Sequence, residues 1–206
     1  MRIIYGTGNK EKINQVKEFF EDNKINIELL SLKDINFNEE IVEDGNTFEE
    51  NSLIKAKAIK EFCNKNNINE IIITDDAGLC VDSLDGRPGI YSARYAGKNA
   101  SQEETINKLL NEMKDIEDKK RTAQFVCVLT CVLKNGELII VRGETKGRIA
   151  RKPEKLGKLT YGPIFISDEY GKVMNELSNE ELKHTHREKA LIELINKLKL
   201  QLKEKD

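Results

Sequence analysis

The sequence predicts an α/β fold built around a mixed β-sheet, and three observations predict it. Short apolar runs alternate with segments of helical periodicity in the first part of the chain, the order expected when helices connect the strands of a sheet. Residues 121–133 and 137–145 then alternate apolar with polar side chains around a turn, which is typical of a long hairpin. The chain closes on an amphipathic helix at 187–202.

The first elements follow from local patterns. Ile3 to Tyr5 form an apolar run that enters a glycine turn, and the residues behind the turn have helical spacing. Residues 26–30 predict a second strand. A helix begins at the capping-box pattern Asn46-Thr47-Phe48-Glu49. Residues 71–74 predict a buried strand, which we expect to stop at Asp75-Asp76.

The later elements carry similar signals. Residues 84–100 are rich in turn residues and predict an ordered loop or arm. Ser101 and Glu104 form a second capping box with a helix face behind it. The dipeptide Asn135-Gly136 marks the tip of the hairpin. A hairpin after alternating strands and helices favours a mixed sheet over a regular doubly wound one.

Composition limits the classes of function. The chain has 206 residues, 38% hydrophobic and 34% charged, with a net charge of −2, so it predicts a globular protein of one domain, 1–206, or of two lobes sharing a cleft. Near-neutral charge argues against binding a nucleic-acid polymer. No apolar run is long enough for a bilayer and no export signal is evident, so we expect a cytoplasmic protein that does not bind membranes, with its four cysteines as thiols. The cysteine and histidine spacings do not match a zinc site.

Three constellations suggest chemistry. The turn Gly6-Thr7-Gly8-Asn9 leads into Lys10, Glu11 and Lys12; exposed amides at a helix start favour an anion, yet a plain turn capped by Asn9 explains this segment equally well. Glu43, Thr47, Asn51 and Lys55 recur every four residues, which alone reads as a solvated helix face.

The third constellation, Asp75-Asp76, follows a buried strand. Ligands gather at the carboxyl ends of strands in α/β proteins, and adjacent carboxylates there need a compensating cation. Oxygen ligands near phosphate suggest Mg²⁺, although exposed acids at the start of a loop are also common. Further along, Gly86–Tyr95 mixes turn residues with aromatics and arginine, and Thr185-His186-Arg187 opens the last helix. Each of these two segments also has a purely structural explanation.

Taken in order, these motifs resemble the inosine/xanthosine triphosphate pyrophosphatase family, also called Ham1-like. The resemblance spans residues 5 to 195 and is carried by the following segments: Thr7-Gly8-Asn9-x-x-Lys12, Glu43-x-Gly45-x-Thr47-Phe48-x-Glu50-Asn51, Lys55-Ala56, Asp75-Asp76-x-Gly78-Leu79, Gly86-x-Pro88-Gly89-x-Tyr91-Ser92-Ala93-Arg94-Tyr95, Pro163-Ile164-Phe165 and Thr185-His186-Arg187. It implies two lobes around a long mixed sheet with flanking helices, a nucleotide cleft between the lobes, a homodimer, and hydrolysis of nucleoside triphosphates such as dITP, ITP and XTP to the monophosphate and pyrophosphate.

The resemblance also implies roles for single residues. Glu43 and Asp76 match the Mg²⁺-binding carboxylates, and Asp76 matches the general base, with Asp75 and Lys12 also expected to be catalytic residues. Asp75, Asn51 and Lys55 are expected to complete the shell around the metal and the phosphates. The remaining matched positions are expected to bind substrate: Thr7, Gly8, Asn9, Lys10, Glu11, Lys12, Asn51, Lys55, Ala77, Leu159, Thr160, Tyr161, Gly162, Lys183, His186 and Arg187.

The segment that reads the base departs from the family. The family's pattern in this segment is Gly-Phe-Gly-Tyr-Asp-Pro, and this chain has Lys158-Leu159-Thr160-Tyr161-Gly162-Pro163. Leu159 therefore stands where the family has a phenylalanine that stacks on the base, and Gly162 stands where it has an aspartate. Ala77 and Thr185 stand where the family has serines. Glu181 occupies the place of a family lysine, for which Lys183 is a candidate substitute. These departures predict a working pyrophosphatase with altered base selectivity. A pyrophosphatase acting on another modified or standard deoxynucleotide and a non-catalytic nucleotide-binding sensor are the alternatives.

Overall fold

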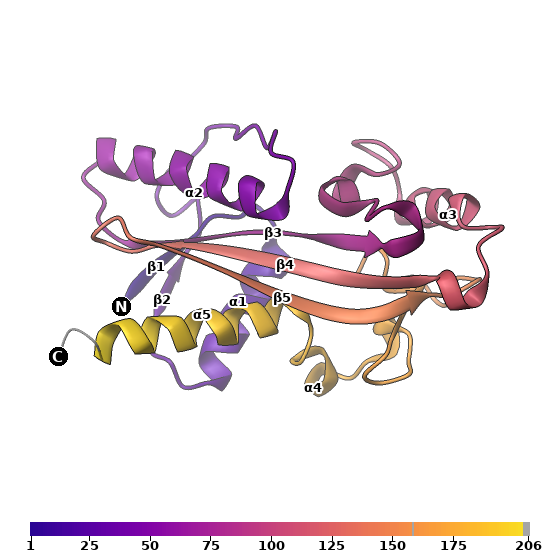
Figure 1. Cartoon of the computed structure of the whole chain (residues 1–206). Helices are drawn as coiled ribbons and strands as arrows, with labels where there is room; N and C mark the ends of the chain where they lie inside the picture. Colours follow the sequence, from indigo (N-terminus) through magenta and orange to yellow (C-terminus); the bar gives the residue numbers. More distant parts are fainter. Residues whose placement is uncertain (158, 204–206) are drawn as a thin grey trace. The chain divides into compact units, whose positions relative to one another are not determined.

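The computed structural model describes residues 1–157 and 159–203, and its central feature is one six-stranded sheet in the order β2-β1-β3-β4-β5-β6 (Figure 1). Strand β1 pairs in parallel with β2 and β3, whereas β5 and β6 pair antiparallel, so the sheet is mixed as expected. The chain divides into two compact units. Unit 1 comprises Met1–Asp76, Cys127–Gly143 and the chain from Arg187; unit 2 comprises Ala77–Val126 and Glu144–His186.

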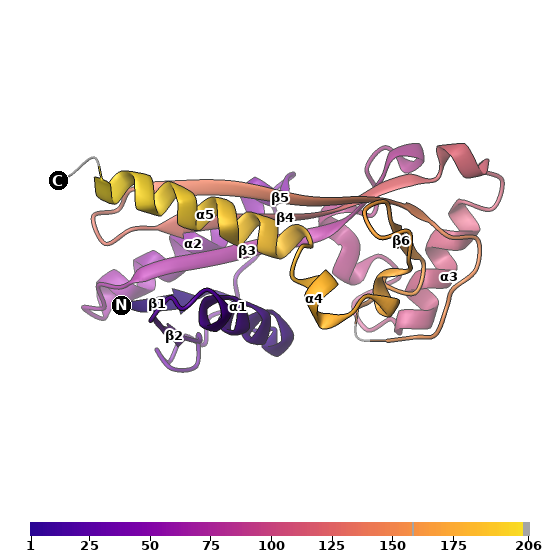
Figure 2. The ribbon, with the colours of Figure 1, turned by 90° about the horizontal axis from the view of Figure 1, so that it is seen from below.

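Unit 1 holds β1 (Arg2–Tyr5), α1 (Lys10–Asp22), β2 (Glu28–Leu30), α2 (Phe48–Lys65) and nearly all of α5 (His186–Lys203). Helix α2 covers one face of its strands, while α1 and α5 cover the other (Figures 1 and 2). An apolar cluster fills the space between α2 and the sheet. Its buried members are Ile4, Leu30, Ile35, Phe37, Ala56, Ile59, Cys63, Ile72 and Val132. Burial of this stripe holds α2 against the sheet.

Unit 2 holds α3 (Gln102–Glu112), β6 (Phe165–Ser167), the short α4 (Asn179–Leu182) and four 3₁₀ turns, η1 (Asp82–Leu84), η2 (Gly89–Arg94), η3 (Asp118–Lys120) and η4 (Met174–Glu176). The capping box of Ser101 and Glu104 opens α3 as predicted. The core of the unit joins α3 to the strands through Leu79, Val81, Ile106, Leu109, Met113, Phe125, Ile149, Phe165 and Met174.

Three long strands contribute to both units: β3 (Ile71–Val81), β4 (Thr122–Val132) and β5 (Leu138–Ile149). The predicted hairpin joins β4 to β5, and Gly136 at its tip has a φ of 87°, which glycine adopts at little cost. The last helix is also confirmed, and it begins one residue earlier than predicted.

Three sequence predictions need correction. The second strand covers only 28–30, and α2 is capped by Thr47, which accepts from the Glu50 amide, one residue later than the predicted box. The strand predicted to stop at Asp75-Asp76 continues to Val81. Apolar residues beyond the two aspartates, Leu79 and Val81, are fully buried, so the strand gains core contacts by continuing.

None of the helices within 1–157 and 159–203 combines the length and the apolar composition that crossing a bilayer requires.

Arg121 closes one end of the unit 2 core. Its buried guanidinium donates to the carbonyl oxygens of Ile149 (2.8 Å), Met113 (2.7 Å) and Ala150 (3.0 Å).

Arg121→Met should lower the free energy of unfolding by about 2 kcal/mol, because buried carbonyls lose their donors. Urea denaturation measures the change. Arg151→Met is the control, because its half-exposed guanidinium bonds to Asp118 and to the carbonyl oxygens of Lys114 and Ile116 at the surface, where water can replace it. It should cost less than about 1 kcal/mol; equal losses would contradict the prediction.

Candidate active site

Asp75 and Asp76 lie side by side in β3, and their side chains lie on opposite faces of the sheet. Asp75 contacts residues of α1 and α5, whereas Asp76 contacts residues of α2. This follows from the alternation of side chains along a strand. The sequence suggested that both carboxylates lie together at a strand end. In the structure they lie on separate faces of the strand, and each organises its own group of side chains within unit 1.

The Asp75 cluster consists of Asp75, Lys12, Arg187, Tyr5 and Gln15. The Asp75 Oδ2 atom accepts from Lys12 Nζ at 2.8 Å and from Arg187 Nη1 at 2.6 Å. Arg187 also donates from Nε to Gln15 Oε1 (3.0 Å) and from Nη1 to the Tyr5 hydroxyl (3.3 Å). The Asp75 side chain is fully buried, so this carboxylate serves as the common anchor of two cationic side chains.

Two opposing effects set the charge of Asp75. Burial raises the pKa of this carboxyl, but the positive charges of Lys12 and Arg187 outweigh burial and hold the pKa well below its usual range. Burial likewise tends to lower the pKa of Arg187, and the Asp75 charge reverses that effect and raises it. Asp75 and Arg187 therefore form an oppositely charged pair at neutral pH, and the other carboxylate oxygen, Asp75 Oδ1, is buried with no hydrogen-bond partner among the described residues.

The Asp76 cluster consists of Asp76, Asn51, Lys55 and Glu43. Asn51 Nδ2 donates to Asp76 Oδ2 at 3.1 Å, and Lys55 Nζ lies 3.9 Å from Asp76 Oδ1. The same Lys55 ammonium pairs with Glu43 Oε2 at 2.5 Å. Asn51 Oδ1 accepts from the Gly45 amide, which fixes the segment that carries Glu43. The predicted spacing of Asn51 and Lys55 on one helix face thus brings two carboxylates around one ammonium.

Asp76 differs from Asp75 in its electrostatics. Burial raises the pKa of Asp76, the charge of Lys55 opposes this, and the net shift is upward, with Glu43 adding to it. A raised pKa and a partly exposed carboxyl are the properties of a proton acceptor. The hard oxygen donors of Glu43 and Asp76 also fit a divalent cation that keeps other positions for water and phosphate. Across the parts of the chain with described side chains, no group of three or more His, Cys, Asp or Glu forms a cation site.

The loop before α1 is closed on itself. Asn9 Oδ1 accepts from the amides of Glu11 (2.9 Å) and Lys12 (3.3 Å), and Thr7 Oγ1 accepts from the Asn9 amide (3.2 Å). This is the capped turn that the sequence allowed. The cap places Lys12 in the first turn of α1, with its ammonium paired to Asp75. Gly8 has open space around its Cα. Lys10 and Glu11 are exposed.

The segment predicted to read the base lies in unit 2. Leu159 packs against the core of that unit, and the Tyr161 hydroxyl donates to the Ser92 carbonyl at 2.9 Å. Gln102 Nε2 donates to the carbonyls of Leu159 (2.7 Å) and Thr160 (3.1 Å), which ties the segment to α3. Lys158, the first residue of the altered motif, lies outside the described residues.

The remaining predicted residues of unit 2 have local contacts. The imidazole of His186 stacks on Phe125, with ring centroids 5.1 Å apart and an interplanar angle of 16°. Lys183 ends α4 and pairs with Glu180 at 3.0 Å. Ala77 follows Asp76 in β3 and is half-buried. Glu181 caps α4 through Ser178 and pairs with Lys172, so its carboxylate has a structural function in this chain.

Asn175 fills the space beside Gly162. A Cβ atom on Gly162 would overlap Asn175 Oδ1 and would lie 3.0 Å from the Leu159 Cβ. The Asn175 amide is held there by its bond to the Lys155 carbonyl at 3.1 Å. The aspartate that the family has at this position therefore does not fit while Asn175 keeps its place.

This fit gives a prediction for stability. Gly162→Asp should cost about 2 kcal/mol of unfolding free energy, because the Asn175 amide must move and lose its bond to Lys155. Adding Asn175→Ala to the same chain should recover most of the loss, as it removes the obstacle. Thermal unfolding of the two single variants and the double variant measures this. A Gly162→Asp protein as stable as the parent would contradict the fit described here.

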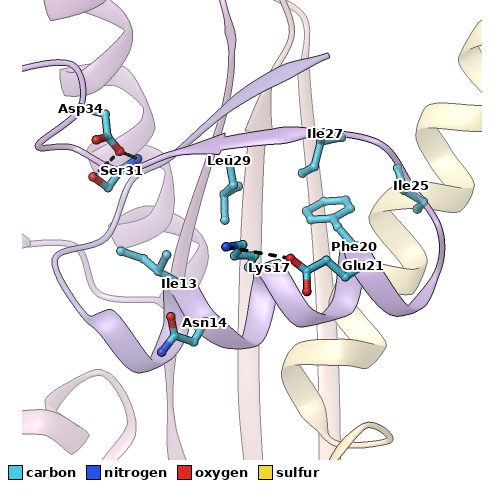
Figure 3. A pocket seen from close by; sticks show the side chains of 10 residues that line it. All are labelled: Ile13, Asn14, Lys17, Phe20, Glu21, Ile25, Ile27, Leu29, Ser31 and Asp34. Carbon is cyan, nitrogen blue, oxygen red and sulfur yellow. Dashed lines mark hydrogen bonds and ion pairs between the residues drawn. The ribbon is translucent and has the colours of Figure 1, made fainter.

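A separate hollow of about 390 Å³ lies in unit 1, between α1 and the chain around β2 (Figure 3). Its lining is Ile13, Asn14, Lys17, Phe20, Glu21, Ile25, Ile27, Leu29, Ser31 and Asp34. None of these residues belongs to the Asp75 or the Asp76 cluster. Among its lining residues, Lys17 pairs with Glu21, and the Ser31 hydroxyl donates to the Asp34 carboxylate.

Sequence reasoning missed Tyr5, Gln15 and Asn175. Tyr5 looks like an ordinary strand residue, and Gln15 is 172 positions away from the arginine that it contacts. One signal was available for Tyr5, because a fully buried tyrosine needs a partner for its hydroxyl.

Comparisons with known proteins relate this chain to a family. The model of the Ham1 family matches residues 3–197. A dITP/XTP pyrophosphatase of Bacillus subtilis is 42% identical over 93% of each chain, and one of Clostridium perfringens is 38% identical over 96% of this chain and 97% of the relative. The structure of the Staphylococcus aureus Ham1 protein superimposes over 100% of both chains with a TM-score of 0.82 and 35% identity. A HAM1 protein from Coxiella burnetii gives 0.83 and 31% identity over 97% of this chain and 98% of the other. With the fold, the full-length match and the relatives in agreement, the chain belongs to the Ham1 family.

Proposed function

We propose that this chain hydrolyses dITP, ITP and XTP to the monophosphate and pyrophosphate, with Asp76 as the general base. Its family and its relatives named dITP/XTP pyrophosphatase make it a nucleoside triphosphate pyrophosphohydrolase. The observation that carries the assignment of the base is the Asp76 cluster, in which a largely buried but still accessible carboxyl of raised pKa adjoins Lys55 and Asn51.

Asp76 accepts the proton of the attacking water. The water oxygen forms a bond to phosphorus, the phosphoanhydride bond breaks, and pyrophosphate leaves with the electron pair. Asn51 orients the carboxyl by donating to Oδ2, which leaves Oδ1 on the side of Lys55. A positioned carboxylate of raised pKa is suited to this step near neutral pH.

Family membership implies a divalent cation in general, and we propose Mg²⁺ held by Glu43 and Asp76. When bound, Mg²⁺ supplies charge neutralisation for the phosphates and lowers the pKa of water. Lys55 pairs with both carboxylates and is the side chain that balances their charge. Asp75 lies on the other face of the sheet, where it holds Lys12 and is not part of this oxygen donor set.

Lys12 and the loop before α1 bind the triphosphate in this proposal. Lys12 carries its charge on a long side chain anchored at Asp75, and the first turn of α1 adds the positive end of the helix dipole. Thr7, Gly8 and Asn9 shape the loop, and the open space at Gly8 leaves room for a phosphate oxygen to approach the backbone.

The base is read by the side chains of unit 2, namely Leu159 to Gly162, Lys183 and His186. Two observations favour altered base selectivity as a second candidate: Leu159 packs against the core, and the Asn175 amide fills the space beside Gly162, where the family has an aspartate. An amide presents both a donor and an acceptor, so it does not discriminate bases as a carboxylate does. Loss of a stacking ring alone weakens binding by about 1–3 kcal/mol.

We further propose that the protein acts as a homodimer in the cytoplasm and takes free nucleotides rather than nucleic-acid polymers. The net charge of −2 supports the preference for a small ligand, because a polymer partner favours a strongly basic surface. Sedimentation at micromolar concentration measures the oligomeric state, and a monomer would contradict this part of the proposal.

A panel of nucleoside triphosphates tests the function. Purified protein is incubated with Mg²⁺ and each of dITP, ITP, XTP, GTP, ATP and the pyrimidine triphosphates, and pyrophosphate release is measured. Preference for dITP, ITP or XTP supports the proposal. Preference for another triphosphate supports the altered-selectivity candidate instead. Nucleotide binding without release from any member of the panel would overturn the enzymatic proposal.

A further inference from the structure

Arg187 is buried and its guanidinium is held on two sides. The Nε edge donates to Gln15 in α1, and Nη1 donates to Asp75 in β3. Nη1 carries two hydrogens and has two further acceptors nearby, the Tyr5 hydroxyl at 3.3 Å and Cys127 Sγ at 3.5 Å. A guanidinium engaged in this way has little freedom to change orientation.

Of those two acceptors, Tyr5 is the stronger. Oxygen accepts hydrogen bonds better than a neutral sulfur does, and burial raises the pKa of Cys127 to about 11, so its sulfur stays a thiol. Tyr5 ends β1, where its ring is fully buried and its backbone is fixed by pairing with Ile73 of β3. The phenol oxygen is therefore a rigid acceptor, placed by the sheet itself.

The chain of contacts leads from Tyr5 to the triphosphate-binding lysine. Tyr5 accepts from Arg187, Arg187 donates to Asp75 Oδ2, and the same oxygen accepts from Lys12. The Tyr5 hydroxyl also interacts directly with the Asp75 carboxylate. Because both cations meet at a single oxygen, a small rotation of the guanidinium moves or reorients the carboxylate. The position of the Lys12 ammonium then changes with it.

We infer that Tyr5 is a positioning residue of this enzyme, whose hydroxyl fixes Arg187 and thereby holds Asp75 and Lys12 in the geometry required for turnover. The inference rests on the proposed binding of triphosphate by Lys12. It assigns Arg187 to the support of the phosphate site, whereas the sequence suggested contact with the substrate. Misplacement of a charged group by a fraction of an ångström lowers transition-state stabilisation more than ground-state binding.

Tyr5→Phe tests this, since it removes one oxygen and keeps the buried ring. We expect kcat for pyrophosphate release to fall about tenfold while KM for the triphosphate changes less than about twofold. Tyr95→Phe is the matched control: it removes a hydroxyl that donates to the Glu112 carboxylate at 2.6 Å within unit 2, and neither residue belongs to the Asp75 or the Asp76 cluster. Its kcat should equal that of the parent. Equal kcat values for the Tyr5 and Tyr95 variants would overturn the inference.

A double-variant cycle with Arg187→Lys separates positioning from general destabilisation. If Tyr5 acts through Arg187, Tyr5→Phe has no further effect on kcat once the guanidinium is gone. A tenfold loss in both backgrounds would overturn the inference. Parent protein without pyrophosphate release would defeat the proposed function itself, whereas an active parent with an unaffected Tyr5→Phe variant would defeat only the role of Tyr5.

Discussion

Asp76→Asn is expected to lower kcat for pyrophosphate release by about a thousandfold, the range found for loss of a general base. The amide has nearly the shape of the carboxyl, so Asn51 and Lys55 keep their positions, but it cannot accept the proton of water. It also removes one negative oxygen from the proposed cation site. Pyrophosphate release under saturating substrate measures the effect.

Asp168→Asn is the control for that experiment, because it makes the same chemical change on an exposed turn and should leave kcat unchanged. Thermal unfolding should show that the Asp76 variant remains folded. A folded Asp76→Asn protein with parental kcat would exclude Asp76 as the base. If the parent only binds nucleotide, the variant would alter affinity alone, which distinguishes an enzyme from a sensor.

Asp75→Asn is expected to have the largest effect on stability, a loss of about 3 kcal/mol at neutral pH. The substitution leaves the buried Arg187 and the partly buried Lys12 without the charge that both contact. Urea unfolding measures the loss. Asp168→Asn again provides the exposed control, with an expected change below about 0.5 kcal/mol.

The loss should depend on pH with a defined sign. Because the pKa of Asp75 is held far below its ordinary value of 3.8, the native state keeps this carboxylate ionised where the unfolded chain takes up a proton. Its contribution is complete above about pH 5 and decreases as the pH falls below about 4. The difference in stability between the parent and Asp75→Asn should therefore shrink in acid, and a difference that grows below pH 4 would contradict this assignment.

The fold was largely predictable from local patterns. The hairpin, the Ser101 capping box and the final helix follow from signals within a few residues of each other, and all are present. The end of β3 was not predictable from local patterns, because a pair of aspartates normally indicates a loop. Cations from α1 and α2 and the buried side chains beyond them make continuation of the strand favourable.

The candidate site was predictable as a set of residues but not as an arrangement. Motif order assigned Glu43, Asn51 and Lys55 to one group, and the helix period explains why α2 brings the last two together. The resemblance placed Arg187 among the substrate-binding residues, and tertiary packing encloses it with Asp75. Contacts of this kind depend on how helices cross a sheet, and no local pattern encodes them.

The placement of adjacent aspartates on opposite faces of β3 makes the site sensitive to chain length rather than to composition. Pairing of β1 with β3 sets Tyr5 opposite Ile73 and so fixes which aspartate meets α2. A deletion of one residue within 71–74 would turn each aspartate to the other face, bringing Asp76 into the place of Asp75 beside the buried arginine and Asp75 into the place of Thr74 beside Ser52 of α2. Substitutions among these apolar residues can be absorbed by repacking. Insertions and deletions cannot be absorbed by repacking, because they turn the aspartates to the other face of the strand. We therefore expect this segment to evolve by substitution at constant length.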